Sequence, residues 1–143
     1  MCYMLFLSTS SSEDLSRYNS ELLRFGAPED DQGPMMSGLE YEYKWFVGSS
    51  SGCSCSFRHL AHGSDLGFGE PEDWYPEDED DIRATGELYR VIASLVDDGH
   101  RVDCVDVWWS TEPVEIGTLP VSLQAVPERA FRLFEDSRFV FES

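Results

Sequence analysis

Residues 101–109 read Arg-Val-Asp-Cys-Val-Asp-Val-Trp-Trp, and this run is the strongest sign of a β-strand in the chain. Its valine, cysteine and tryptophan side chains fall on both faces of an extended backbone, which is typical of a strand covered on both sides. Asp103 and Asp106 interrupt the apolar pattern. Because a buried carboxylate needs a partner, we expect these two residues to pair with a basic side chain or to lie at the end of the strand.

Further strands and helices are expected before this central strand. The apolar residues 2–8 and the aromatic residues 39–47 predict two more strands. Residues 13–25 follow a serine-rich capping signal and carry apolar side chains at spacings of three and four, which predicts an amphipathic helix. A second helix is expected to begin near Asp80 or Asp81, after a long irregular segment.

The C-terminal tail has two interpretations. Residues 126–134 would form a short helix with Pro127 in its first turn. Alternatively, residues 131–135 and 138–142 would form two strands around a turn at residues 136–137. The alternating aromatic side chains on both sides of that turn favour the hairpin.

The length and composition are those of one globular domain. The chain has 143 residues, of which 41% are hydrophobic, and this is enough to bury a single core. Together with the order of the expected elements, this predicts an α+β fold in which a single mixed β-sheet carries two main helices packed on it. The domain is expected to span residues 1–143.

Charge and hydropathy narrow the range of partners and compartments. The chain has 28 acidic and 10 basic residues, and a formal net charge of −18 repels phosphate backbones, so we expect no nucleic-acid binding. No apolar run is long enough to predict a membrane span, and residues 1–7 lack the basic region of a signal peptide. Four cysteines in such a chain predict a reducing compartment, and therefore a cytoplasmic protein.

The strongest sign of chemistry is Gly-Ser-Ser-Ser-Gly-Cys-Ser-Cys-Ser-Phe at residues 48–57. In an extended backbone Cys53 and Cys55 project to the same face, which places their sulfur atoms side by side. The glycines and serines let the loop turn tightly and approach another group closely. This pattern predicts a thiol site at the end of the strand that precedes it.

Two cysteines do not complete a zinc site, which needs four ligands. The additional candidate ligands are Cys2, Cys104, His59 and His62. His59 and His62 follow Cys55 by four and seven residues, so one loop would be able to wrap an ion. We therefore predict a metal site formed by Cys53, Cys55, Cys2, His59 and His62, with zinc as the metal. The alternatives are Cys-x-Cys redox chemistry and cysteines that are merely buried.

The acidic run at residues 70–81 contains eight carboxylates and predicts an exposed loop that leads into a helix N-terminus. Trp74 and Tyr75, set among these acids, either fix the loop to the domain or contact a basic protein partner. The chain would then be a non-enzymatic acidic interaction module of the inhibitor or immunity type. No phosphate-binding loop, nucleophile elbow or zincin helix occurs in the sequence, so no enzyme class is assigned.

The Met-Cys start, the Gly48-Ser49-x-x-Gly52-Cys53-x-Cys55-x-Phe57 segment and the Phe-rich tail resemble a group of small, uncharacterised bacterial proteins. The serines at positions 54 and 56 stand where glycine is expected in that group. No activity is attached to the group, so the resemblance implies nothing about function.

Overall fold

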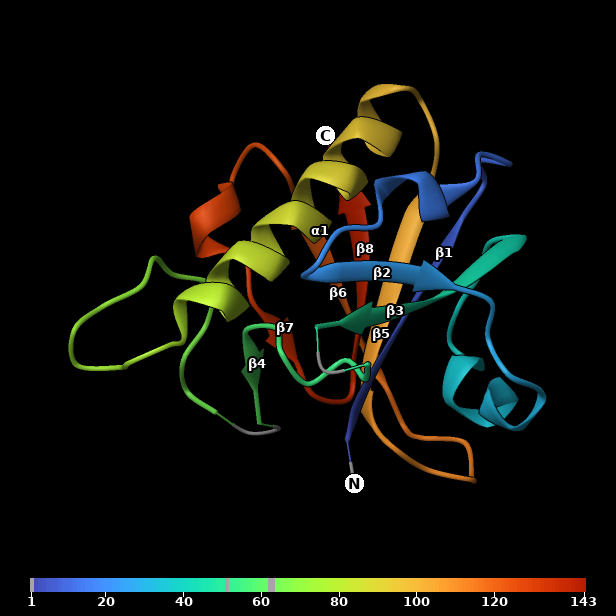
Figure 1. The fold of residues 1–143 in the computed structure, drawn as a ribbon, viewed down its shortest axis with the longest axis horizontal. Coiled ribbons are helices and arrows are strands. Elements are labelled where there is room, and N and C mark those ends of the chain that lie inside the picture. Colours follow the sequence, from blue (N-terminus) through green and yellow to red (C-terminus); the bar gives the residue numbers. More distant parts are fainter. Residues whose placement is uncertain (1, 51, 62–63) are drawn as a thin grey trace.

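The centre of the fold is a six-stranded mixed sheet (Figure 1). The computed structural model describes every residue except Met1, Ser51, His62 and Gly63. The strands of this sheet are β1 (Tyr3–Thr9), β2 (Leu23–Gly26), β3 (Tyr43–Ser49), β5 (Val102–Trp108), β6 (Gly117–Ser122) and β8 (Ser137–Glu142). Their order is β2-β3-β1-β5-β8-β6, and neighbouring strands are antiparallel except for the parallel pair β6 and β8.

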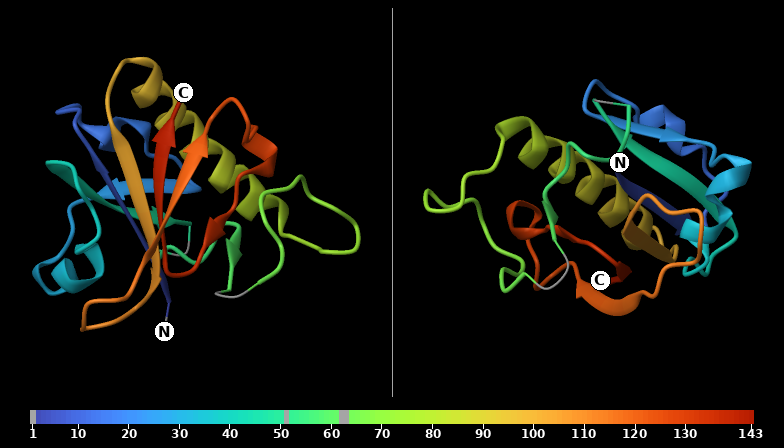
Figure 2. Two further views of the ribbon diagram at one scale, coloured as in Figure 1. Left: turned by 180° about the vertical axis from the view of Figure 1, so that it is seen from behind. Right: turned by 90° about the horizontal axis from the view of Figure 1, so that it is seen from below.

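One long helix and several short elements surround the sheet. The second, two-stranded sheet pairs β4 (His59–Leu60) in parallel with β7 (Leu133–Phe134). The helices are α1 (Glu79–Asp97) and the 3-10 helices η1 (Leu15–Tyr18), η2 (Asp30–Met36) and η3 (Glu128–Ala130). Figure 2 (left) shows the sheet from the side opposite α1, so that β5, β8 and β6 lie in front of this helix. No helix in the described part of the chain has the length and apolar character needed to cross a bilayer.

The central position predicted for the strand at residues 101–109 is confirmed. β5 lies between β1 and β8, and every residue of β5 except Trp108 is buried. On one face, Cys104 packs in the core formed with Leu88 and Ile92 of α1. On the other face, Val105 belongs to a second apolar cluster that is covered by Met35 of η2. Both faces of β5 are therefore covered, as its apolar sequence indicates.

The predicted helix over residues 13–25 is wrong: the segment forms η1 and then β2, so the described part of the chain has one α-helix and not two. Local side-chain hydrogen bonds compete with the helix here. The Asp14 carboxylate accepts a hydrogen bond from Ser16 N (3.0 Å), and Asn19 Oδ1 accepts one from Phe25 N (2.7 Å). The apolar side chains still reach the core, but they do so from a strand at the edge of the sheet.

The second helix and the tail were predicted more closely. α1 begins at Glu79, after Asp78, whose carboxylate accepts a hydrogen bond from Asp80 N (2.8 Å). The segment before it is irregular and mostly exposed, as expected.

The two tail strands exist, but the hairpin pairing is wrong, because β7 pairs with β4 while β8 pairs with β5 and β6. β6 was not predicted, since Pro120 is unusual in a strand except at the edge that β6 occupies.

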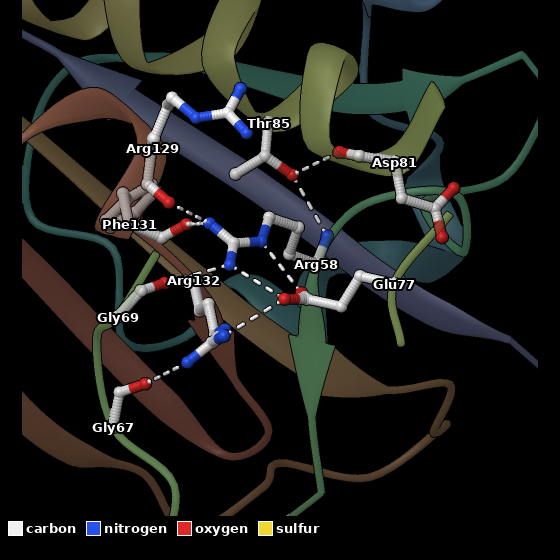
Figure 3. Close-up of polar contacts among 9 residues, drawn as sticks. All are labelled: Arg58, Gly67, Gly69, Glu77, Asp81, Thr85, Arg129, Phe131 and Arg132. Carbon is white, nitrogen blue, oxygen red and sulfur yellow. Dashed lines mark hydrogen bonds and ion pairs between the residues drawn. The ribbon is translucent and has the colours of Figure 1, made fainter. Parts of the chain in front are cut away.

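A buried arginine fixes the long segment between β4 and α1 to the domain (Figure 3). Arg58 is 3% exposed, and its guanidinium donates two hydrogen bonds to the Glu77 carboxylate, at 2.7 and 2.8 Å. It also donates to the carbonyl oxygens of Gly69 (2.9 Å), Phe131 (3.2 Å) and Arg129. All five of its N–H groups are used, which is the most that an arginine can donate.

A second buried arginine completes this polar cluster. Arg132 donates to Glu77 (3.0 Å) and to the carbonyl oxygen of Gly67 (2.8 Å). Burial alone would raise the pKa of Glu77, but the hydrogen bonds and charges of Arg58 and Arg132 lower it below its usual value. Glu77 is therefore ionised at neutral pH, and it ties the start of α1 to the loop and to the tail.

Replacing Arg58 with methionine should destabilise the protein strongly, because it leaves buried carbonyl oxygens and part of the Glu77 carboxylate without donors. We expect the free energy of unfolding, measured by urea denaturation, to fall by about 3–5 kcal/mol. Arg83→Met is the matched control, because the Arg83 side chain is 63% exposed and its ion pair with Asp80 is long, at 3.5 Å. The control should change stability by less than about 1 kcal/mol. Equal effects of the two substitutions would show that the buried cluster does not hold the loop.

Candidate functional site

Three cysteines come together at the start of β1. The sulfur atoms of Cys2, Cys53 and Cys55 all lie within 4.8 Å of one another, and we call these three residues the thiol cluster. Cys2 directly precedes β1, the other two lie in the loop that follows β3, and all three residues are half-buried. Of the additional candidate ligands Cys2, Cys104, His59 and His62, the structure brings Cys2 to the loop sulfurs. Cys104 lies elsewhere, fully buried in the core beneath α1.

Ser54 places the cysteine loop against the sheet. Its hydroxyl donates a hydrogen bond to the carbonyl oxygen of Val47 in β3 (2.5 Å) and accepts one from the backbone N–H of Leu5 in β1 (2.9 Å). Ser54 is fully buried, so its two neighbours in sequence are held beside Cys2. The turn before it depends on Gly52, whose φ of 85° lies in the left-handed region that glycine adopts without strain.

A buried ion pair fixes the same loop from the other side. His59 Nδ1 lies 2.7 Å from Asp106 Oδ2, and His59 Nε2 contacts the carbonyl oxygen of Ser54. Both ring nitrogens face oxygen atoms, and a doubly protonated ring satisfies both contacts as a donor. Burial lowers the pKa of His59, but the charge of Asp106 and the two hydrogen bonds outweigh this effect and raise it.

This pair determines the position of His59, one of the two predicted histidine ligands. Both nitrogens of His59 are used by Asp106 and Ser54, so the structure does not bring His59 into the thiol cluster as a ligand. The Tyr3 ring stacks on the His59 ring, with the ring centres 4.2 Å apart. His59 thus supports the loop and the start of β1. His62, the other predicted histidine ligand, lies outside the described residues.

The environment of Cys55 keeps its thiol protonated. Burial raises the pKa of Cys55 to about 12, and hydrogen bonding with Cys53 and Cys2 adds to the effect. The backbone N–H of Tyr3 lowers the value only in part. Because the thiolate is the reactive form, Cys55 is a weak nucleophile at neutral pH. A metal ion that binds here has to displace a proton.

A pocket of about 420 Å³ adjoins the thiol cluster. This volume lies in the range of small-molecule sites. Cys2 and Cys53 form part of the wall, whereas Cys55 does not. The remaining lining residues are Met4, Ala27, Glu29, Gln32, Phe46, Gly52 and Trp109. The cluster therefore faces a concave surface that is large enough to hold a ligand.

Each of the two acids of β5 has a basic partner, but Asp106 Oδ1 has no hydrogen-bond partner among the described residues. Asp103 accepts hydrogen bonds from Arg138 Nε (2.9 Å) and from the backbone N–H of Glu40 (3.1 Å), so the expected arginine partner is confirmed. Asp106 pairs with His59 instead. Its need for a partner was visible in the sequence, but the histidine lies 47 positions away, and no local pattern identifies it.

The fold and the site define a class: an α+β protein with a half-buried cluster of three cysteines in the wall of a pocket. No family model, no curated protein and no solved structure matches the chain. The function has therefore to be inferred from the geometry of the cluster and from its surroundings.

Replacing His59 with alanine should loosen the cysteine loop, because the substitution leaves Asp106 unpaired and releases the Ser54 carbonyl. We expect Cys53 and Cys55 in the folded protein to react with a thiol reagent at least about tenfold faster, which corresponds to ~1.4 kcal/mol of lost local stability. His100→Ala, in the turn after α1, is the control and should leave the rate unchanged. An unchanged rate in His59→Ala would show that the ion pair does not hold the loop.

Proposed function

We propose that this chain binds a transition metal ion through the thiolates of Cys2, Cys53 and Cys55, with zinc as the first candidate. The proposal depends on one observation, the approach of the three sulfur atoms to within 4.8 Å of one another. Zinc–sulfur bonds of about 2.3 Å in a tetrahedron place sulfur atoms roughly 3.8 Å apart. Small rotations of the cysteine side chains would therefore suffice to enclose an ion.

The number of donors also supports the proposal. Structural zinc sites have four protein ligands, whereas catalytic sites have three and keep one position open. The thiol cluster supplies three ligands and borders a pocket on the side of Cys2 and Cys53. The formal net charge of −18 favours the approach of a cation.

Thiol redox chemistry is a weaker interpretation of the same residues. Exchange between thiols and disulfides starts with attack by a thiolate. Burial raises the pKa of Cys55 to about 12, so this residue supplies little thiolate at neutral pH. A bound metal ion stabilises the thiolate directly and does not depend on that pKa being low.

Metal analysis and cobalt substitution test the proposal. We expect about one zinc or Co²⁺ ion per chain, with the sulfur-to-cobalt absorption bands of a thiolate site. Cys53→Ser combined with Cys55→Ser should abolish binding and keep the circular dichroism spectrum, because the core is large enough to fold without an ion. Cys104→Ala is the matched control and should retain the metal. A wild-type chain that takes up no zinc or cobalt, or equal uptake by the double variant, would contradict the proposal.

A specific observation also favours the second candidate, an acidic interaction module. Trp74 is 67% exposed at the tip of the acidic loop, which the Arg58–Glu77 pair fixes to the domain. Tyr75 is turned inward instead, with the Arg132 guanidinium 5.7 Å from its ring centre. An anchored loop that presents one large aromatic side chain among carboxylates suits a basic protein partner.

Trp74→Ala tests this second candidate without changing the charge of the chain. The immobilised wild-type protein should retain a basic protein that the variant releases, because aromatic anchors carry a large share of binding energy. Trp109→Ala serves as the control, since Trp109 lies in the pocket wall and not in the loop. Equal retention by wild type and Trp74→Ala would show that the attraction is one of charge alone.

A further inference from the structure

The lining of the pocket beside the thiol cluster is mainly apolar. Met4 is buried, and the aromatic side chains of Phe46 and Trp109 contribute to the same wall. The polar lining residues Glu29 and Gln32 bond to each other: the Glu29 carboxylate accepts the backbone N–H of Gln32, and Gln32 Oε1 accepts the backbone N–H of Glu29 (2.8 Å). The surface offered to a ligand is therefore mostly hydrocarbon and aromatic ring.

The charge of a loaded thiol cluster limits what binds next to it. A divalent ion with three thiolates carries a net charge of −1. An anionic fourth ligand would increase this charge to −2 against an apolar wall, in a chain whose formal net charge is already −18. A neutral donor leaves the charge unchanged. An uncharged nitrogen base is therefore favoured over a thiolate or a carboxylate in the open position.

We propose that the pocket binds a small aromatic molecule with a neutral nitrogen donor of the imidazole type, whose nitrogen occupies the fourth position on the metal. This inference rests on the proposed function, because the ion has to be present. Cys2 and Cys53 are in the pocket wall, so an ion held by the cluster borders the pocket. The body of the ligand would pack against Phe46 and Trp109, since aromatic rings pair favourably.

Titration of the cobalt-loaded protein with 4-phenylimidazole and with imidazole tests this inference. Both probes offer the same kind of nitrogen, and only the first has an apolar body. We expect 4-phenylimidazole to shift the visible absorption bands of the cobalt ion and to bind at least about tenfold more tightly than imidazole, through burial of the phenyl ring. Unshifted bands, or equal affinities of the two probes, would overturn the inference.

Two substitutions in the pocket wall sharpen this test. Ala27→Phe adds a large side chain at an exposed position of the pocket lining. Trp109→Ala removes an aromatic ring from the wall, at a residue that is 39% exposed in the folded chain. Each should keep the cobalt spectrum and lose the preference for 4-phenylimidazole. Ala125→Phe, at an exposed position outside the pocket lining, is the control and should keep the preference.

The outcomes separate this inference from the proposed function. If the cobalt bands do not respond to 4-phenylimidazole, the proposed metal site stands and the inferred nitrogen ligand is contradicted. A preference that survives both Ala27→Phe and Trp109→Ala would also overturn it, because the phenyl ring would then lie elsewhere. Absence of thiolate–cobalt bands in the wild-type protein would contradict the proposed function, and the ligand with it.

Discussion

The ion pair between His59 and Asp106 is the constraint on which the rest of the site depends. Asp106 is fully buried in β5, and His59 Nδ1 lies 2.7 Å from its carboxylate. The other nitrogen of His59 contacts the carbonyl oxygen of Ser54, which lies between the two cysteines of the loop. The central strand, the second sheet and the cysteine loop are thus joined by one imidazole ring. Breaking a buried pair of this kind costs about 3–5 kcal/mol, so the loop has little freedom to leave the sheet.

The same principle, a buried charge that requires its partners, organises the rest of the molecule. Arg58 uses all five of its N–H groups to fix the acidic loop and the tail, and Asp103 is paired with Arg138. These pairs join segments that are far apart in the sequence. The described residues of the cysteine loop and the acidic loop are consequently anchored to the domain. An anchored thiol cluster needs little reorganisation to bind an ion, and an anchored loop needs little ordering to bind a partner.

The sequence predicts the parts of this structure that depend on local patterns. The apolar run of β5, the acidic start of α1 and the glycine-rich turn before Cys53 each carry their own signal. The helix expected over residues 13–25 failed because side-chain hydrogen bonds of Asp14 and Asn19 replaced helical ones. Periodicity alone does not distinguish the two outcomes, since both bury the same side chains.

The site could be predicted only in part. Two cysteines separated by one residue indicated the loop, and Cys2 was among the expected ligands because of its residue type. The position of Cys2 beside the loop results from the antiparallel pairing of β1 with β3. His59 was expected as a ligand on the basis of spacing, but its partner Asp106 is 47 positions away. Arg58 gave no signal at all, because its partners are mostly backbone carbonyl groups of distant segments. Contacts of this kind follow from the tertiary fold and not from a motif.

X-ray absorption at the zinc edge of the loaded protein is the measurement that tests the central claim most directly. The account predicts three sulfur neighbours at about 2.3 Å and one lighter neighbour, nitrogen or oxygen, at about 2.0 Å. Cys2→Ser should reduce the sulfur neighbours to two, because Cys2 joins the loop cysteines in the cluster. A zinc ion surrounded only by nitrogen and oxygen, or a sulfur number that Cys2→Ser leaves unchanged, would contradict the account.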